Sequence, residues 1–196
     1  MKKNKGFTLI ELLAVVVILG VLLLIAVPSV SEYISNSRKS TYIRSAEGYI
    51  DGVRQMITSR EISAKRKDVT FYVPIECIGS EQGGKSPYGE WERAYVVVTY
   101  ADSKYEYYWT SFDSANMGIK LTHESLLDED LIEESINNID TTISVGSRSK
   151  IMRYEIVGDV DETEEAINCE LAKDGSGNFI EITPSRYIED LKSLYE

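Results

Sequence analysis

Residues 7–30 read FTLIELLAVVVILGVLLLIAVPSV and contain a single charged side chain, that of Glu11. As an α-helix with a rise of about 1.5 Å per residue, this run would extend roughly 36 Å, which exceeds the ~30 Å hydrocarbon core of a bilayer. Residues 1–6, Met-Lys-Lys-Asn-Lys-Gly, bring three lysines to its amino-terminal side. That flank favours a cytoplasmic amino terminus and an exported remainder of the chain. The sequence therefore predicts one membrane-spanning helix.

Three kinds of amino-terminal segment are compatible with this run. A secretory signal peptide would be cut after it, and residues 29–31, Ser-Val-Ser, could serve as a small-x-small site. However, the apolar run is longer than in most signal peptides and carries an acid near its start. A plain single-span anchor leaves Glu11 unexplained, because a carboxylate in an apolar helix is costly and usually marks a function. The third kind accounts for Gly6, Phe7 and Glu11 together.

Residues 5–12, KGFTLIEL, closely resemble the class III signal of type IV prepilins and type II secretion pseudopilins. The resemblance extends to about residue 35. It implies that a membrane peptidase cleaves between Gly6 and Phe7 and then methylates the new amino group of Phe7. Residues 1–6 would be the leader that is removed. The apolar helix would stay on the mature chain, where it anchors the subunit in the membrane and later packs in a filament core.

The same resemblance implies a role for Glu11 in assembly. Its carboxylate would pair with the amino group of Phe7 on a neighbouring subunit and set the axial register. A carboxylate buried among helices needs such a partner, because desolvation is otherwise unfavourable; a protonated, tolerated acid is the alternative. Pro28 removes a backbone hydrogen bond and predicts a helix kink. The family resemblance adds that the stretch from Gly20 to Pro28 unwinds in the filament, with a simple bend as the alternative.

Residues 31–60 predict an amphipathic continuation of the helix. Apolar side chains recur there at spacings of three and four, at Ile43, Ala46, Ile50, Val53 and Ile57. One helix over residues 7–60 would be roughly 80 Å long. Gly48 and Gly52 would permit the close approach of a sheet. A coiled coil is the alternative, but the apolar face is too short for sustained heptads.

Residues 61–196 predict a β-rich globular head. Residues 69–73 would form a strand that ends at Pro74, and residues 94–100 and 105–110 would form a hairpin. The other expected elements, in chain order, are a loop at 79–89, a short helix or irregular excursion at 124–139, a strand pair at 143–145 and 150–157, a turn at 174–178 before a strand at 179–182, and a helix at 185–196. The predicted fold class is α+β: the long helix packs against an antiparallel sheet, in the ladle-like layout that the family resemblance implies.

Cys77 and Cys169 lie on the predicted outer side of the membrane, where thiols can oxidise. A bond between them would close a loop of about 93 residues and stabilise the fold by roughly 4–5 kcal/mol in the chain-entropy model. By resemblance, the disulfide that several pilins carry near the carboxyl terminus favours this bond. Some Gram-positive relatives lack one, and two buried thiols are the alternative.

The net charge of −11 argues against nucleic acid as a ligand of the average surface, since phosphate binding needs clustered Lys and Arg. The basic run at residues 60–67 leaves a local basic patch open, with a solvated helix end or loop as the ordinary interpretation. The acidic run at residues 159–165 is typical of a solvated surface.

No metal site, cofactor or catalytic residue is predicted. Asp174, Ser176 and Asn178 have the first spacings of a calcium loop, but Phe179 and Ser185 stand where the loop needs Gly and Glu. The chain lacks a Cys/His cluster and the GxSxG, P-loop and HExxH motifs.

His123 is the chain's single histidine, and it precedes Glu124. The two could be imagined as an acid/base pair, but an exposed histidine without a catalytic role is far more common. The chain is therefore not expected to be an enzyme.

The sequence predicts a structural subunit, a prepilin that polymerises through its amino-terminal helix into a surface filament for adhesion, aggregation, motility or DNA uptake. A pseudopilin of a type II secretion or competence system is one alternative, and a membrane-anchored binding module that never polymerises is another. Expected partners are identical or related pilin subunits, a prepilin peptidase/methyltransferase, an inner-membrane assembly platform and its ATPase. The subunit would cross the membrane once before assembly, with its head outside, and would later lie in an extracellular filament. Residues 91–95 loosely resemble pilin-like heads of Gram-positive Firmicutes.

Overall fold

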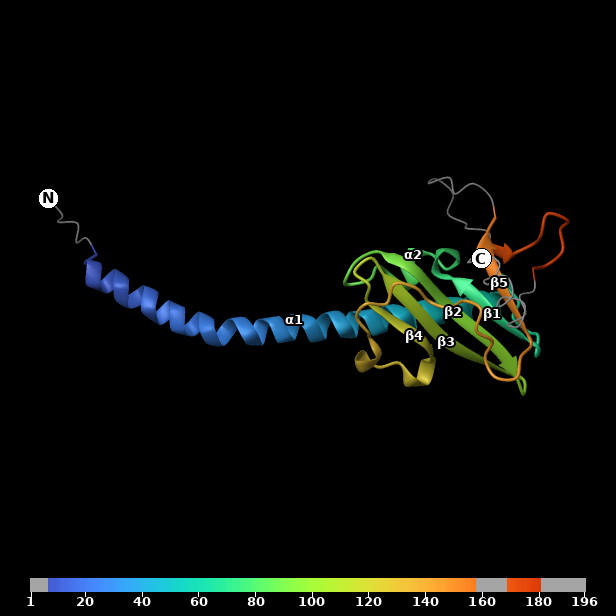
Figure 1. Cartoon of the computed structure of the whole chain (residues 1–196), viewed down its shortest axis with the longest axis horizontal. Helices are drawn as coiled ribbons and strands as arrows, with labels where there is room; N and C mark the ends of the chain where they lie inside the picture. Colours follow the sequence, from blue (N-terminus) through green and yellow to red (C-terminus); the bar gives the residue numbers. More distant parts are fainter. Residues whose placement is uncertain (1–6, 158–168, 181–196) are drawn as a thin grey trace, which may run out of the picture. The chain divides into compact units, whose positions relative to one another are not determined.

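The computed structural model describes residues 7–157 and 169–180. The elements in chain order are α1 (Leu9–Ser59), β1 (Val69–Pro74), η1 (Ile75–Cys77), α2 (Ser80–Gly83), β2 (Trp91–Ala101), β3 (Lys104–Asp113), β4 (Gly118–His123), η2 (Glu124–Leu126), η3 (Glu129–Leu131), β5 (Lys150–Ile156) and β6 (Cys169–Leu171) (Figure 1). The predicted leader, the acidic run at 159–165 and the predicted helix at 185–196 lie outside the described residues.

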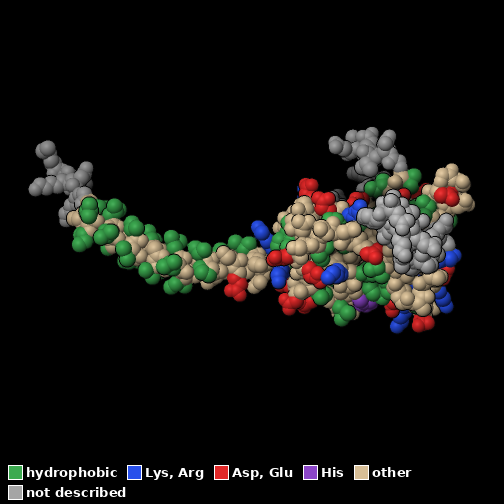
Figure 2. Space-filling model, in the orientation of Figure 1, with side chains coloured by type: hydrophobic (Ala, Val, Ile, Leu, Met, Phe, Trp, Pro, Cys, Tyr) green, Lys and Arg blue, Asp and Glu red, His purple; other side chains and the backbone are tan. Residues whose placement is uncertain are grey.

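The chain divides into two compact units, with the boundary between Arg38 and Lys39 inside α1. In the first unit, every described residue is exposed, including the large apolar side chains (Figure 2). The side chain of Phe7, for example, is 86% exposed. By length and composition, α1 is apolar enough to cross a membrane. The apolar surface of this unit thus lacks any covering from the described part of its own chain.

In the second unit, α1 buries one face against the sheet. Ala46, Ile50 and Val53 are buried as predicted. Tyr42 and Tyr49 are buried as well, although the sequence analysis left them out of the helix face. The Tyr49 ring stacks on Trp109 of β3 with a centroid distance of 5.8 Å. Tyr42 makes a hydrogen bond between its hydroxyl and the Ser111 hydroxyl at 2.8 Å. The aromatic residues of α1 therefore carry much of the contact between helix and sheet.

The described strands form one sheet in the order β4-β3-β2-β1-β5-β6. The β2–β3 hairpin is confirmed, and its turn consists of Asp102 and Ser103, both with positive φ (49° and 64°). Positive φ at both central residues is the requirement of a type I′ turn, which commonly connects the strands of a two-residue hairpin.

The prediction of an antiparallel sheet is wrong for one strand pair, because β5 pairs with β1 in parallel. The prediction of a strand at residues 143–145 is also wrong. Tyr72 donates a hydrogen bond from its hydroxyl to the Ile143 carbonyl at 2.9 Å, and the Val145 amide donates to Thr70 Oγ1 at 3.0 Å. The segment is therefore held by side chains of β1, and the edge of β1 stays open for β5. The observed fold is a long helix packed against a mixed sheet, an α+β arrangement.

Gly48 and Gly52 permit a close approach, but not the approach of the sheet. A Cβ on Gly48 would lie 2.3 Å from the backbone oxygen of Gln82, and a Cβ on Gly52 would lie 2.4 Å from Ile78 Cγ2. The neighbour is thus the segment between β1 and β2. That segment, predicted as a loop, contains the helical turn α2.

Candidate functional site

Thr8 and Glu11 form a capping box at the start of α1. The Thr8 amide and the Thr8 hydroxyl both donate to Glu11 Oε2, each at 2.8 Å. The Glu11 amide donates back to Thr8 Oγ1 at 3.3 Å, and the Leu12 amide donates to the Thr8 carbonyl at 3.2 Å. This is the reciprocal pattern of an S/T-x-x-E sequence at a helix start. It explains why the helix begins at Leu9, and it fixes the Glu11 carboxylate at the amino end of α1.

Glu11 is among the residues that the sequence predicts as functional, whereas this box is not among the predicted features. The signal was present in the sequence, since Thr and Glu stand three residues apart directly before an apolar run. In the structure, Glu11 Oε1 has no hydrogen-bond partner among residues 7–157 and 169–180. The residues that flank Glu11 in sequence include exposed apolar ones, among them Phe7, Ile10 and Leu12. Among the described residues, one oxygen of this exposed carboxylate thus has no partner.

The helix is continuous through Gly20 and Pro28. Near Pro28, the Ser29 hydroxyl donates to the Ile25 carbonyl at 3.3 Å, and the Ser31 hydroxyl donates to the Val27 carbonyl at 3.1 Å. Such bonds compete with backbone pairing and often accompany a helix bend. A Cβ built on Gly20 would meet no atom within 4 Å. In the single chain, therefore, nothing in the described part requires a glycine at this position.

A disulfide joins Cys77 in η1 to Cys169 in β6, with a Cα–Cα distance of 5.7 Å. The two residues are 92 positions apart in sequence. Cys77 is buried in the main hydrophobic core, and Cys169 packs against the same core. The bond ties the short edge strand β6 to the segment that follows β1.

The turn at residues 174–178 uses Asp174 internally. Its Oδ1 accepts hydrogen bonds from the Ser176 and Asn178 amides, both at 2.9 Å. These bonds, chiefly the one from Asn178, lower the pKa of the Asp174 carboxyl. Within the described ranges, no three His, Cys, Asp or Glu side chains are grouped so that they could hold a metal ion.

His123 and Glu124 do not face each other as an acid/base pair. His123 Nδ1 accepts from the Ser125 amide at 3.2 Å, which caps η2. Glu124 Oε2 accepts from Arg54 of α1 at 2.7 Å. Both side chains thus hold η2 in place.

The family model described as the prokaryotic N-terminal methylation motif matches residues 1–27. A fimbrial protein of Dichelobacter nodosus is 29% identical over 107 residues, which is 50% of this chain and 67% of that protein. The type IV major fimbrial protein FimA of the same organism is 33% identical over 82 residues, 42% of this chain and 48% of FimA.

The ComG operon protein 3 homolog of Bacillus licheniformis is 38% identical over 59 residues, which cover 30% of this chain and 57% of that protein. The matches thus span about half to two thirds of these relatives' own lengths. No solved structure shows significant similarity to the chain. The methylation motif includes Gly6, Phe7 and Glu11, the three residues that the sequence analysis singled out.

Proposed function

We propose that this chain, a member of the type IV pilin and pseudopilin family, is a prepilin that polymerises into a surface filament. The part of α1 that lies in the first unit would form the contacts between subunits. The observation that carries the proposal is the capping box at the start of a span-length apolar helix. Thr8 orients the Glu11 carboxylate, and Glu11 Oε1, which has no partner among the described residues, would accept from another molecule.

Cleavage between Gly6 and Phe7 would convert the Phe7 amide into a cationic amine, and methylation would leave that amine basic. The amine of a neighbouring subunit is then a suitable partner for Glu11 Oε1. In hydrocarbon, apolar side chains gain little from contact with other apolar side chains, so polar pairing and close packing decide how helices associate. One carboxylate and one amine per subunit would supply that pairing. The free surface around Gly20 would allow a neighbouring helix to come close.

The amino-terminal apolar helix fits membrane anchoring before assembly. We place the amino terminus in the cytoplasm because of the three lysines in residues 1–6, and the second unit outside. The partners we propose are related subunits, a prepilin peptidase/methyltransferase, and an assembly platform with its ATPase. The relatives named above as fimbrial proteins favour a structural role over catalysis.

Mass spectrometry of sheared native filaments tests the processing step. We expect a mature chain that begins at Phe7 and is one methyl group heavier than its sequence. A product that begins at Met1, or one that begins after residue 30, would contradict the proposal, because the helix would be unprocessed in the first case and lost in the second.

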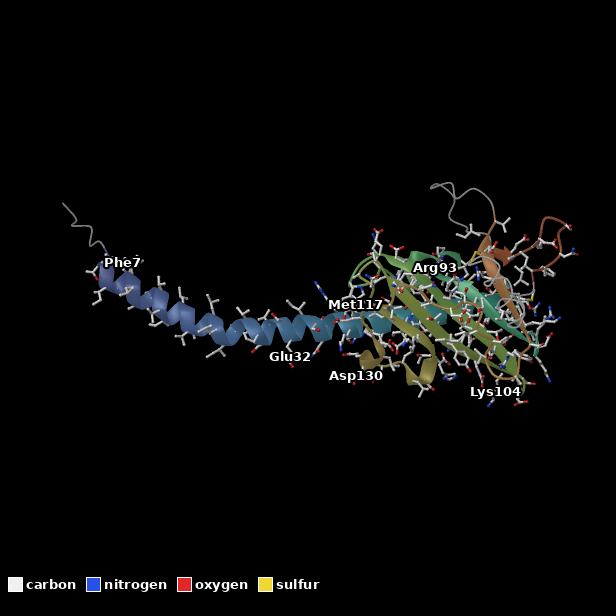
Figure 3. All side chains as sticks on the ribbon, in the orientation of Figure 1. Phe7, Glu32, Arg93, Lys104, Met117 and Asp130 are labelled. Carbon is white, nitrogen blue, oxygen red and sulfur yellow. A yellow bond between two sulfur atoms is a disulfide. The ribbon has the colours of Figure 1, made fainter. Side chains whose placement is uncertain are left out.

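The change Glu11→Val tests the assembly step. We expect normal membrane insertion and loss of filaments, because the neighbour's amine loses its partner. Glu32→Val is the matched control, since Glu32 is the other carboxylate in the first unit (Figure 3). We expect this variant to assemble normally. Thr8→Val should give fewer filaments and Thr8→Ser near-normal numbers, because only serine keeps the hydroxyl that donates to Glu11. Normal filaments in the Glu11→Val strain would refute the pairing.

A pseudopilin is the second candidate, and the match to the ComG operon protein 3 homolog favours it. The two candidates differ in the filament's extent. Electron microscopy of cells with native expression should show long surface filaments for a pilin and none beyond the cell envelope for a pseudopilin.

A further inference from the structure

One end of the sheet gathers residues from three separate segments. The parallel pairing of Val69 with Lys150 brings the starts of β1 and β5 together. The hairpin pairing of Ala101 with Lys104 places the end of β2 beside the start of β3. Because β2 runs antiparallel to β1, all four strand ends lie at the same end of the sheet. We call this the basic end, and it comprises residues 65–68, 101–104 and 148–150.

Cations outnumber carboxylates at the basic end. Its carboxylates are Asp68 and Asp102, and its cations are Lys65, Arg66, Lys67, Lys104, Arg148 and Lys150. Asp68 lies 3.2 Å from Arg66 and 3.8 Å from Lys150. The exposed lysines Lys65, Lys67 and Lys104 form no ion pair with any described residue, although the Lys65 ammonium lies 5.8 Å from the Tyr100 ring centroid. In a chain with a net charge of −11, the described residues of these three segments carry six cations against two carboxylates.

The opposite end of the sheet lies beside an acidic patch, residues 124–134. This segment has no Lys or Arg, and its carboxylates are Glu124, Asp128, Glu129, Asp130, Glu133 and Glu134. Arg54 pairs with Glu124 at 2.7 Å and Lys120 with Glu133 at 2.8 Å. The other four carboxylates form no ion pair within the described residues.

The two charged regions lie far apart on the second unit. Glu133 forms an isolated antiparallel β-bridge with Gly118 through the backbone. Gly118 pairs with Phe112 near the end of β3. Lys104 begins the same strand, so the two regions are separated by roughly 27 Å along β3. Figure 3 shows Asp130 and Lys104 at opposite ends of the second unit. They cannot neutralise each other within one chain.

We infer that the basic end of one subunit binds the acidic patch of a second copy, in a contact repeated along the filament. The inference rests on the proposed polymerisation. A contact between two different surfaces of identical chains is heterologous, and its repetition builds a closed ring or an open helical filament. The proposed packing of the apolar helices selects the filament. Like ends of two copies repel, which disfavours a symmetric dimer. The charge pairing would fix which head follows which, while the apolar helices supply the core.

A charge-swap experiment on the full-length chain in its own cells tests the contact. The basic variant is Lys65→Glu/Lys67→Glu/Lys104→Glu, and the acidic variant is Glu129→Lys/Asp130→Lys/Glu134→Lys. Asp128 is left intact because it caps η3 by accepting from the Asp130 amide. Each variant alone should reduce sheared filaments at least about tenfold, and the combination of all six changes should restore them to near the wild-type amount.

Two controls accompany the swap. The variant Arg44→Glu/Lys85→Glu/Arg93→Glu changes the net charge by the same amount at positions outside the basic end and should assemble normally. Immunoblots of membranes should show equal amounts of subunit in every strain, so that lost filaments report assembly.

The outcomes separate this contact from the proposed function. Recovery of filaments in the combined variant supports the contact. A combined variant as defective as either parent would overturn it, as would wild-type filament amounts in both parents. Normal filaments in the basic variant together with loss of DNA retention at the cell surface would also overturn it, because the basic end would then bind a polyanion. Absence of filaments from wild-type cells would overturn polymerisation and the contact together.

Discussion

The disulfide between Cys77 and Cys169 should contribute a large share of the stability of the second unit. We consider the double change Cys77→Ala/Cys169→Ala, which removes the bond without burying a hydroxyl. The two cysteines are 92 positions apart. In the chain-entropy model, a cross-link over such a loop stabilises the fold by roughly 4.5 kcal/mol, because it restricts the unfolded chain. Loss of the buried sulfur of Cys77 would add about 1 kcal/mol through the cavity it leaves.

Urea unfolding of the full chain in detergent micelles measures this effect. Trp109 is fully buried and stacks on Tyr49, so its fluorescence reports the contact between α1 and the sheet. With a slope of about 2 kcal/mol per molar urea, the combined loss of about 5.5 kcal/mol corresponds to a downward shift of roughly 2.7 M in the midpoint. Wild-type protein treated with reductant should shift by nearly the same amount, since it loses the same cross-link.

Thiol titration of the unreduced native chain supplies the control. We expect no reactive thiol in denaturant without reductant. Two titratable thiols would refute the bond itself. Unfolding midpoints of oxidised and reduced protein that agree within about 0.3 M would refute the reasoning on loop entropy, because the bond would then be present without constraining the unfolded state.

Three further predictions concern the second unit. Tyr42→Phe should lower the free energy of unfolding by about 1–2 kcal/mol, because the buried Ser111 hydroxyl loses its partner; the additional change Ser111→Ala should recover part of that loss in the same urea assay. Gly48→Ala should destabilise by about 1–3 kcal/mol, because its Cβ would lie 2.3 Å from the Gln82 carbonyl oxygen; a gain of about 1 kcal/mol, as helix propensity alone predicts, would contradict this packing. The pKa of Asp174 is lowered from 3.8 in the folded chain, so its contribution to stability is present above that pH and is lost as the pH falls below it. Asp174→Asn should therefore flatten the fall of the melting temperature below about pH 4, and an unchanged slope would contradict the assignment.

The features that the sequence predicted well are those decided by neighbouring residues. The helix predicted over residues 7–60 is observed at Leu9–Ser59, because an uninterrupted apolar run and a regular spacing define it locally. The β2–β3 hairpin follows from alternation and from a turn of two residues. The capping box is equally local, but it was not predicted. Its signal is the pair of Thr8 and Glu11 at a spacing of three, and not the acid alone.

Features that depend on distant segments were not predicted. The parallel pairing of β1 with β5 joins segments about 80 positions apart, and nothing in either strand specifies that partner. The burial of Tyr42 and Tyr49 depends on Ser111 and on Trp109, which meet them only after the sheet forms. The basic end likewise appears only when strand order brings its three segments to one place.

The structure suggests how one carboxylate can serve both the single chain and the filament. A carboxylate in apolar surroundings must have its charge compensated, and hydrogen bonds to one oxygen meet only part of that need. Thr8 satisfies Oε2 of Glu11 within the chain and orders the start of α1. Oε1 has no partner among the described residues, and the helix end is already formed without one. A neighbour's amine can therefore bind without breaking the cap, and assembly requires no ordering of α1 at that moment. If Glu11 needed both oxygens for its own helix, pairing with a second subunit would have to disrupt the helix start first. In the proposed assembly, the division of the carboxylate between Thr8 and a partner would make an early, stable helix compatible with later polymerisation.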